Sequence, residues 1–149
     1  MRAVIQRVSR AEVRVGEDVT GKIGPGILLL LGVSIDDAER DAEYLLEKTV
    51  NLRIFEDAEG KMNLSLLDTG GELLVVSQFT LYGDTRRGRR PSFIRSAPPD
   101  RANELYEHFV RSAQARVANV ATGRFQAMMN VELVNDGPVT IMLDSERVF

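Results

Sequence analysis

The chain of 149 residues has no cysteine, no tryptophan and a single histidine. The missing cysteine excludes disulfides, cysteine-ligated zinc, iron–sulfur clusters and a thiol nucleophile. The single histidine excludes a histidine-rich metal site within one chain. The helical pattern places His108 among charged residues, opposite the apolar Leu105 and Phe109. We predict that His108 is a solvated surface residue and serves in no Ser-His-Asp triad. We expect no metal and no cofactor.

Long apolar runs are absent as well. The longest, Ile27 to Leu31, is far shorter than the ~20 residues that a membrane span needs. The opening sequence MRAVIQRVSR alternates apolar and polar residues and lacks the apolar core of a signal peptide. We therefore expect a cytoplasmic protein with no membrane partner.

Lysine is scarce, with 3 residues against 16 arginines, and the formal net charge of −3 gives no global attraction to nucleic acid. The arginine excess fits phosphate or carboxylate binding, and it fits a GC-rich or heat-adapted source equally well. Four arginines, Arg86, Arg87, Arg89 and Arg90, surround Gly88 with no acidic residue between them. This segment is either a solvated loop or an anion site, for which a phosphate backbone is the obvious ligand.

Hydrophobic periodicity predicts a mixed α/β fold. The predicted strands are 2–8, 11–15, 19–23, 27–33, 53–55, 73–82, 125–134 and 139–143, and the predicted helices begin at Asp36, as N-cap, and at Pro98-Pro99-Asp100. The first helix has a buried face of Ala38, Ala42, Leu45, Leu46 and Thr49, and the second has one of Ala102, Leu105, Phe109, Ala113 and Val117. We expect residues 1–149 to form a single domain with a curved, barrel-like β-sheet packed with two main helices. The strand order does not follow from the sequence.

Polar residues close the strongest predicted strand, Leu73 to Tyr82. Alternation places Gln78 and Thr80 on one face, and Ser77 and Phe79 on the other. Polar groups at the end of a buried strand are costly unless they are paired. They either bond to neighbouring backbone, or they form a polar pocket in which hydroxyls, an amide and backbone N–H groups hold a substrate carbonyl.

A second unusual segment is Asn135-Asp136-Gly137-Pro138, which separates the last two predicted strands. Its composition is that of a hairpin turn. A Gly-Pro dipeptide also joins the most permissive residue to the most rigid one, and X–Pro bonds admit the cis form. The segment is therefore either a plain turn or a device that presents fixed carbonyls with no side chain in the way.

Two stretches carry a family resemblance: SQFTL at Ser77 to Leu81, and NDGPVT at Asn135 to Thr140. Five further stretches match in order: MRAVIQRVSRAEV, GKIGPGILLLLGV, LRIFEDAEGKMNLSL, RPSF and TGRF. Through them the sequence resembles the D-aminoacyl-tRNA deacylase family over essentially its whole length. One departure concerns Met128, where the family often has an acidic residue.

The resemblance implies a homodimer that hydrolyses the ester between a D-amino acid and the 3′ adenosine of tRNA. It implies that glycine mischarged on tRNA is also a substrate. It assigns Ser77, Gln78, Phe79 and Thr80 to the catalytic pocket, matches Met129 to a pocket methionine, and places Gly137 and Pro138, joined by a cis bond, in the pocket of the partner subunit. The arginine segment 86–90 is then the expected contact for the tRNA acceptor end.

Mechanistic alternatives stay open at this stage. We expect rigid carbonyls at positions 137 and 138 to hold the α-amino group and to fill the space that an L side chain needs. For the chemical step, either Thr80 is the nucleophile, or the pocket stabilises the oxyanion while water or the ribose 2′-hydroxyl assists. The rival functions are a non-catalytic nucleic-acid-binding module that uses Arg86 to Arg90, and a small-molecule hydrolase at a dimer interface.

Overall fold

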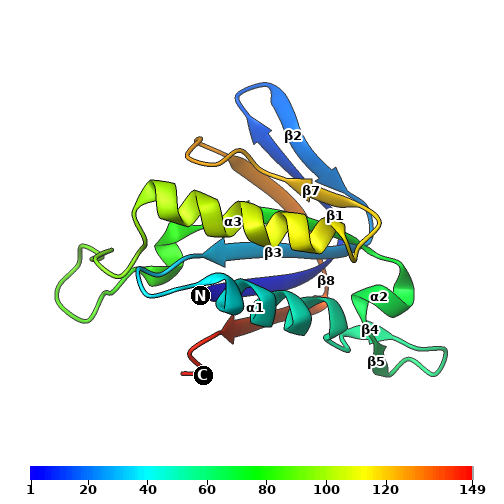
Figure 1. The fold of residues 1–149 in the computed structure, drawn as a ribbon. Coiled ribbons are helices and arrows are strands. Elements are labelled where there is room, and N and C mark those ends of the chain that lie inside the picture. Colours follow the sequence, from blue (N-terminus) through cyan, green and yellow to red (C-terminus); the bar gives the residue numbers. More distant parts are fainter. Residues whose placement is uncertain (149) are drawn as a thin grey trace.

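A six-stranded sheet forms the centre of the computed structural model, which describes residues 1–148 (Figure 1). The strands are β1 (Arg2–Val15), β2 (Asp18–Ile23), β3 (Gly26–Gly32), β6 (Glu72–Ser77), β7 (Val120–Thr122) and β8 (Asn130–Asp144). Their order is β2-β1-β3-β6-β7, and β8 pairs with β1. The β3–β6 and β6–β7 pairs are parallel, whereas the pairs made by β1 are antiparallel.

The sheet curls until its two ends meet. A Cβ atom on Gly21 of β2 would lie 2.4 Å from the carbonyl oxygen of Thr122 in β7, so only glycine permits this approach. The expected mixed α/β fold with a curved, barrel-like sheet is thereby confirmed. Because β3 lies in the middle of this sheet, both of its faces are buried. Leu29 packs toward the helices, and Leu28 packs into the concave side with Leu74 and Val76.

Two long helices, α1 (Glu39–Asn51) and α3 (Pro99–Gln114), lie side by side across one face of the sheet (Figure 1). They are the two main helices that periodicity predicts, and a four-residue α2 (Leu66–Thr69) adds a third. The predicted stripes are buried at Ala42, Leu45, Leu46 and Thr49 of α1, and at Leu105, Phe109, Ala113 and Val117 of α3 and the residues that follow it. Among residues 1–148, no helix is both long enough and apolar enough to cross a membrane.

The start of α1 differs from the prediction. Asp36 is not the N-cap; Ala38 is, and the Asp41 carboxylate accepts a hydrogen bond of 3.0 Å from the Ala38 N–H. The carboxylate of the neighbouring Asp37 is buried, where it accepts hydrogen bonds from the Met1 amino group and the Ser34 N–H. These contacts are long-range or depend on the loop path, so the local capping pattern does not reveal them.

Several strand boundaries also differ. Residues 2–8 and 11–15 form one strand, β1, which exchanges β3 for β2 as its partner near the exposed Ser9 and Arg10. The predicted strand 53–55 becomes β4 (Phe55–Glu56), which pairs with β5 (Met62–Leu64). The predicted strand 125–134 begins only at Asn130, and β7 was not predicted.

Candidate active site

A cavity of about 660 Å³ opens where the parallel strands β3 and β6 end. Carboxyl ends of parallel strands are a common place for ligand sites. Leu31 and Ser77 lie at these strand ends, and Tyr106 of α3 and Phe125 stand among the opposing walls. The lining is mostly apolar. Its polar residues are Ser77, Gln78, Ser96, Gln126 and Tyr106.

The backbone turns sharply at the end of β6. The predicted strand 73–82 is wrong: β6 ends at Ser77, and a 3₁₀ helix, η1 (Phe79–Tyr82), follows. The Gln78 N–H still donates to the Leu31 carbonyl of β3, and the Leu81 N–H then donates back to the Gln78 carbonyl at 3.3 Å. The strict alternation expected for residues 77–80 therefore does not apply, because a 3₁₀ helix repeats every three residues.

The side chains of this turn form a polar edge. Gln78 donates through Nε2 to Oγ1 of Thr80, and Ser96 donates through Oγ to the Phe79 carbonyl at 3.1 Å. The exposed Phe79 ring packs edge-on against Phe93, with 5.0 Å between centroids. Ser77, Gln78 and Phe79 line the cavity, whereas Thr80 reaches it through its contact with Gln78.

The opposing wall comes from α3 and the segment before β8. Tyr106 is buried and donates to the Val75 carbonyl at 2.9 Å, and its ring lies 5.9 Å from that of Phe125. Burial raises the pKa of the Tyr106 hydroxyl far above its usual range, so this group stays neutral. Met129 and Met128 both line the cavity, and 93% of the surface of Met128 is exposed.

Residues 135–138 do not form a plain hairpin turn, which was one of the two alternatives for this segment. They belong to β8, which runs antiparallel to β1 on both sides of them. Gln6 pairs with Thr140 and Val8 pairs with Asn135, so residues 136–139 bulge opposite Arg7 alone. The Gly137–Pro138 bond is cis, and both residues are exposed. Of the described residues that line the cavity of this same chain, none is Gly137 or Pro138.

Arg7 supports this bulge from inside the protein. Its Nε donates to the Asp136 carbonyl at 3.1 Å and its Nη1 to the Ile54 carbonyl at 2.6 Å. Asn135 adds bonds from Nδ2 to the carbonyls of Arg7 and Val139. Sequence reasoning did not select Arg7. The available signal was an arginine in register with the buried Ala3 and Ile5 of an alternating strand.

The arginine segment lies between η1 and α3 and projects from one end of the molecule (Figure 1). Arg86 binds the Asp84 carboxylate through Nε and Nη2, which holds the pKa of that carboxyl far below its usual range. Among the described residues, Arg87, Arg89 and Arg90 have no ion-pair partner and are exposed. The segment is followed, after Pro91 and Ser92, by Phe93 of the cavity wall.

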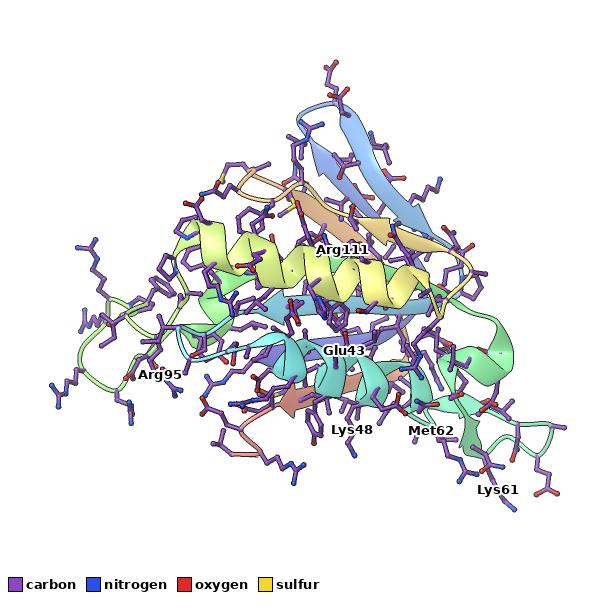
Figure 2. All side chains as sticks on the ribbon, in the orientation of Figure 1. Glu43, Lys48, Lys61, Met62, Arg95 and Arg111 are labelled. Atoms are coloured by element: carbon purple, nitrogen blue, oxygen red, sulfur yellow. The ribbon has the colours of Figure 1, made fainter. Side chains whose placement is uncertain are left out.

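His108 lies away from the cavity lining. Its Nε2 is 2.6 Å from Oε1 of Glu43, the residue of α1 that faces α3 in Figure 2. Ser112 donates to the same carboxylate oxygen, and hydrogen bonds from Ser112 and His108 lower the pKa of Glu43. His108 thus joins the two helices at the surface and, being outside the cavity lining, provides no base there.

Comparison with known proteins adds to this geometry. The family model for D-Tyr-tRNA(Tyr) deacylase matches residues 4–144. The proteins named D-aminoacyl-tRNA deacylase of Kosmotoga olearia and Clostridioides difficile are 61% and 60% identical over 149 residues, which is 100% of both chains in each case. The chain belongs to the D-Tyr-tRNA(Tyr) deacylase family.

Solved structures agree with the family. A structure described as "c-Myc DNA Unwinding Element Binding Protein" superposes with a TM-score of 0.92 at 41% identity, covering 97% of this chain and 98% of that one. A structure described as a probable eukaryotic D-amino acid tRNA deacylase has a TM-score of 0.80 at 17% identity, covering 95% and 97%, and shares the fold.

Proposed function

We propose that the cavity beside η1, completed by residues 137 and 138 of a second copy of the chain, is where the ester of a D-aminoacyl-tRNA is hydrolysed. Membership of the family gives the general activity: the chain is a hydrolase, a D-aminoacyl-tRNA deacylase, and its partner is aminoacylated tRNA. Since this substrate arises where aminoacyl-tRNA is made and used, we also propose a cytoplasmic location.

The observation that carries the proposal is the exposed bulge at residues 136–139. Gly137 and Pro138 do not line the cavity of their own chain, so their carbonyls cannot bind a substrate in that cavity. β8 pairs only with β1 among the described strands, so its other edge is free. The exposed Val134 and Met142 add apolar surface to this strand. An unpaired edge with apolar side chains favours association with a second copy.

Backbone carbonyls are suited to sensing handedness. Carbonyls of Gly137 and Pro138 from the partner copy would bind the α-amino group and occupy the space that an L side chain requires. A D side chain points elsewhere and is accepted. Glycine has no side chain, so glycyl-tRNA mischarged on a non-cognate tRNA would pass as well. Discrimination then rests on exclusion of one hand and needs no pocket shaped for a particular amino acid.

For the chemical step, we favour stabilisation of the oxyanion over nucleophilic attack by Thr80. The Thr80 oxygen already accepts a hydrogen bond from Gln78, which leaves its hydroxyl proton available to donate to a substrate oxygen. No histidine lines the cavity to remove that proton. Water or the ribose 2′-hydroxyl would then attack the ester. Thr80→Ala should reduce kcat by roughly 10²- to 10³-fold, the usual effect of losing one oxyanion donor.

The deciding experiment compares hydrolysis of D-tyrosyl-tRNA and L-tyrosyl-tRNA by the wild type and by Pro138→Ala. The wild type should hydrolyse the D-ester much faster, and Pro138→Ala should lower this preference. Pro25→Ala, at the turn before β3, is the matched control and should keep it. An unchanged D/L rate ratio in Pro138→Ala would show that the backbone at 138 does not exclude the L-ester. A substrate that lacks the 2′-hydroxyl separates ribose assistance from attack by water.

A second candidate function is nucleic-acid binding independent of catalysis. It is favoured by the relative named for a DNA unwinding element and by the exposed Arg87, Arg89 and Arg90. A pure binding module would retain its function in Gln78→Ala, whereas a deacylase would not. A small-molecule hydrolase, the third alternative, would cleave a D-tyrosine alkyl ester as fast as the tRNA ester.

A further inference from the structure

Arg2, at the start of β1, joins three elements: β1 itself, β8 and η1. Its Nε donates to Oδ2 of Asp144 at the end of β8, at 2.9 Å. Its Nη1 donates to the carbonyl of Leu81 in η1, at 3.1 Å. Its guanidinium carbon lies 4.7 Å from the ring centroid of Tyr82, the last residue of η1. A single side chain thus joins two strands to the 3₁₀ helix that follows the polar edge of the cavity.

We propose that Arg2 is a positioning residue for deacylation: through Leu81 and Tyr82 it holds η1, and with it Gln78 and Thr80, in the geometry that the reaction needs. Arg2 itself does not line the cavity. The inference rests on the proposed active site at Ser77 to Thr80 and adds to it a support from outside the cavity lining.

The 3₁₀ helix needs such a support because it is short. Four residues of 3₁₀ helix have few and poorly aligned internal hydrogen bonds. On the cavity side, η1 is held at the exposed Phe79, by Ser96 at its carbonyl and by Phe93 at its ring. The firmest anchor is Tyr82, which is 3% exposed. Its hydroxyl has no hydrogen-bond partner within residues 1–148, so the ring provides the anchorage.

The guanidinium is itself fixed by buried groups. The Asp144 side chain is 1% exposed, and its second oxygen accepts a hydrogen bond from the Glu146 N–H at 2.7 Å. Arg95 approaches the same Tyr82 ring, with its guanidinium carbon 5.8 Å from the centroid. Asp144 therefore sets the direction of Arg2, and Arg2 sets the position of Leu81 and Tyr82. The strand that ends at Asp144 also carries the bulge at 136–139.

Only arginine suits this position. Its planar fork reaches the carboxylate and the carbonyl from different nitrogens while its face lies over the ring. Lysine would keep the positive charge beside Asp144 but has a single ammonium, which cannot span the carboxylate, the Leu81 carbonyl and the Tyr82 ring together. Arg2→Lys thus separates the positioning contacts from the charge.

The test compares the steady-state kinetics of Arg2→Lys and wild type with D-tyrosyl-tRNA. We expect kcat to fall roughly 10- to 100-fold, the range that follows a small misplacement of reacting groups, with KM changed less than about twofold. Tyr82→Leu, which removes the ring, should reproduce this loss. Arg53→Lys is the matched control, because the Arg53 Nε also donates to a backbone carbonyl, that of Asn63, in the β4–β5 region; its kcat should stay at the wild-type value.

A core variant distinguishes a general loss of stability from the loss of a positioning contact. Val50→Ala removes buried volume from α1 without touching η1. If Val50→Ala lowers Tm as much as Arg2→Lys and lowers kcat equally, Arg2 is only structural and the inference is overturned. Wild-type kcat in Arg2→Lys overturns it as well. Gln78→Ala distinguishes failure of the proposed active site from failure of the positioning role. Full activity of Gln78→Ala refutes the proposed active site. An inactive Gln78→Ala together with a fully active Arg2→Lys refutes the positioning role alone.

Discussion

Arg7 is a buried arginine whose hydrogen bonds go mainly to backbone carbonyls. Such a side chain fixes the path of the main chain, because each buried carbonyl that loses its donor carries a penalty. The Asp136 carbonyl that it holds immediately precedes Gly137. A Cβ atom on Gly137 would lie 2.7 Å from Nη2 of Arg7, and the φ of Gly137 is +121°, which L side chains rarely adopt. Both the backbone conformation and the closeness of Arg7 therefore favour glycine at 137.

Arg7→Met keeps the apolar stem and removes the donors. We expect the free energy of unfolding to fall by about 1–3 kcal/mol per buried carbonyl left unpaired. The D/L preference in deacylation should fall with it, because the bulge loses its support. Urea unfolding and the two-substrate assay measure these effects. Arg10→Met, on the same strand but exposed, is the control; equal losses in both variants would mean that the buried bonds contribute nothing specific.

The buried tyrosines make stability depend on pH in the alkaline range. Burial raises the pKa of the Tyr82 and Tyr106 hydroxyls above the usual value near 10. The unfolded chain loses these protons near pH 10 while the folded chain keeps them, so stability is complete below about pH 10 and falls as pH rises further.

Tyr82→Phe removes one of these protons together with a hydroxyl that has no described partner. We expect little change in unfolding free energy at pH 7 and a shallower decline above pH 10, by up to about 1.4 kcal/mol per pH unit. Tyr106→Phe should also flatten the decline but lose stability at pH 7, because it breaks the bond to the Val75 carbonyl. Parallel alkaline curves for wild type and Tyr82→Phe would contradict the assignment.

At the scale of elements, β8 has two tasks. One edge pairs with β1 along almost its whole length, and the bulge interrupts that pairing only opposite Arg7. The other edge is free among the described strands. The side chains alternate accordingly, with Leu133, Ile141 and Leu143 packed inward and Val134 and Met142 outward. One strand therefore extends the sheet beside β1 and carries the surface proposed for the second copy.

A charge on that outer surface should separate the copies. We expect Met142→Lys to shift the mass in sedimentation toward the 16.6 kDa of one chain and to lower deacylation in parallel. The control is Met62→Lys on β5 (Figure 2), since Met62 and Met142 are equally exposed at 59% and 58%. A wild-type protein that is monomeric and fully active would overturn the proposed dimer, and an unchanged mass for Met142→Lys would place its interface elsewhere.

For the whole molecule, the distribution of charge matters more than its sum. The net charge of −3 repels a polyanion weakly, yet four exposed arginines gather on one segment, residues 86–90. Arg86 is already neutralised by Asp84, so Arg87, Arg89 and Arg90 are the free cations of that segment. We expect this arrangement to direct the tRNA end to one place on the protein.

The salt dependence of tRNA binding tests this arrangement. Each lost phosphate contact should flatten the log–log slope by roughly 0.7–0.9. We expect alanine at Arg87, Arg89 or Arg90 to have this effect, and Arg86→Ala to change the slope less. Arg40→Ala, an exposed arginine on α1, should leave it unchanged. A quadruple alanine variant of the segment with the wild-type slope would show that tRNA phosphates are bound elsewhere.

The elements that were predictable from sequence share one property: their pattern depends on neighbours along the chain. The helical stripes of α1 and α3 and the doubly apolar β3 follow from periodicity, because every position of such an element meets the same environment. The ends of elements were less predictable. β6 stops at Ser77 because the chain turns there into η1, which packs so closely on Gly32 that a Cβ atom at 32 would lie 3.0 Å from Leu81, and this contact has no local signature.

The sequence alone determined the fold class, the two main helices, the absence of cysteine chemistry and, through its motifs, the resemblance to a family. It did not determine that residues 135–138 continue a strand, because an Asn-Asp-Gly-Pro run has turn composition and only the pairing with β1 and the buried Arg7 override it. The tertiary structure also decided which polar groups meet: Gln78 with Thr80, and Arg2 with Leu81 and Asp144. The physical reason is that propensity acts between near neighbours, whereas the Arg2 contacts join residues far apart in the chain whose approach is fixed by burial of the whole sheet. Gln78 and Thr80 are close in sequence, but they meet because the chain turns there from β6 into η1.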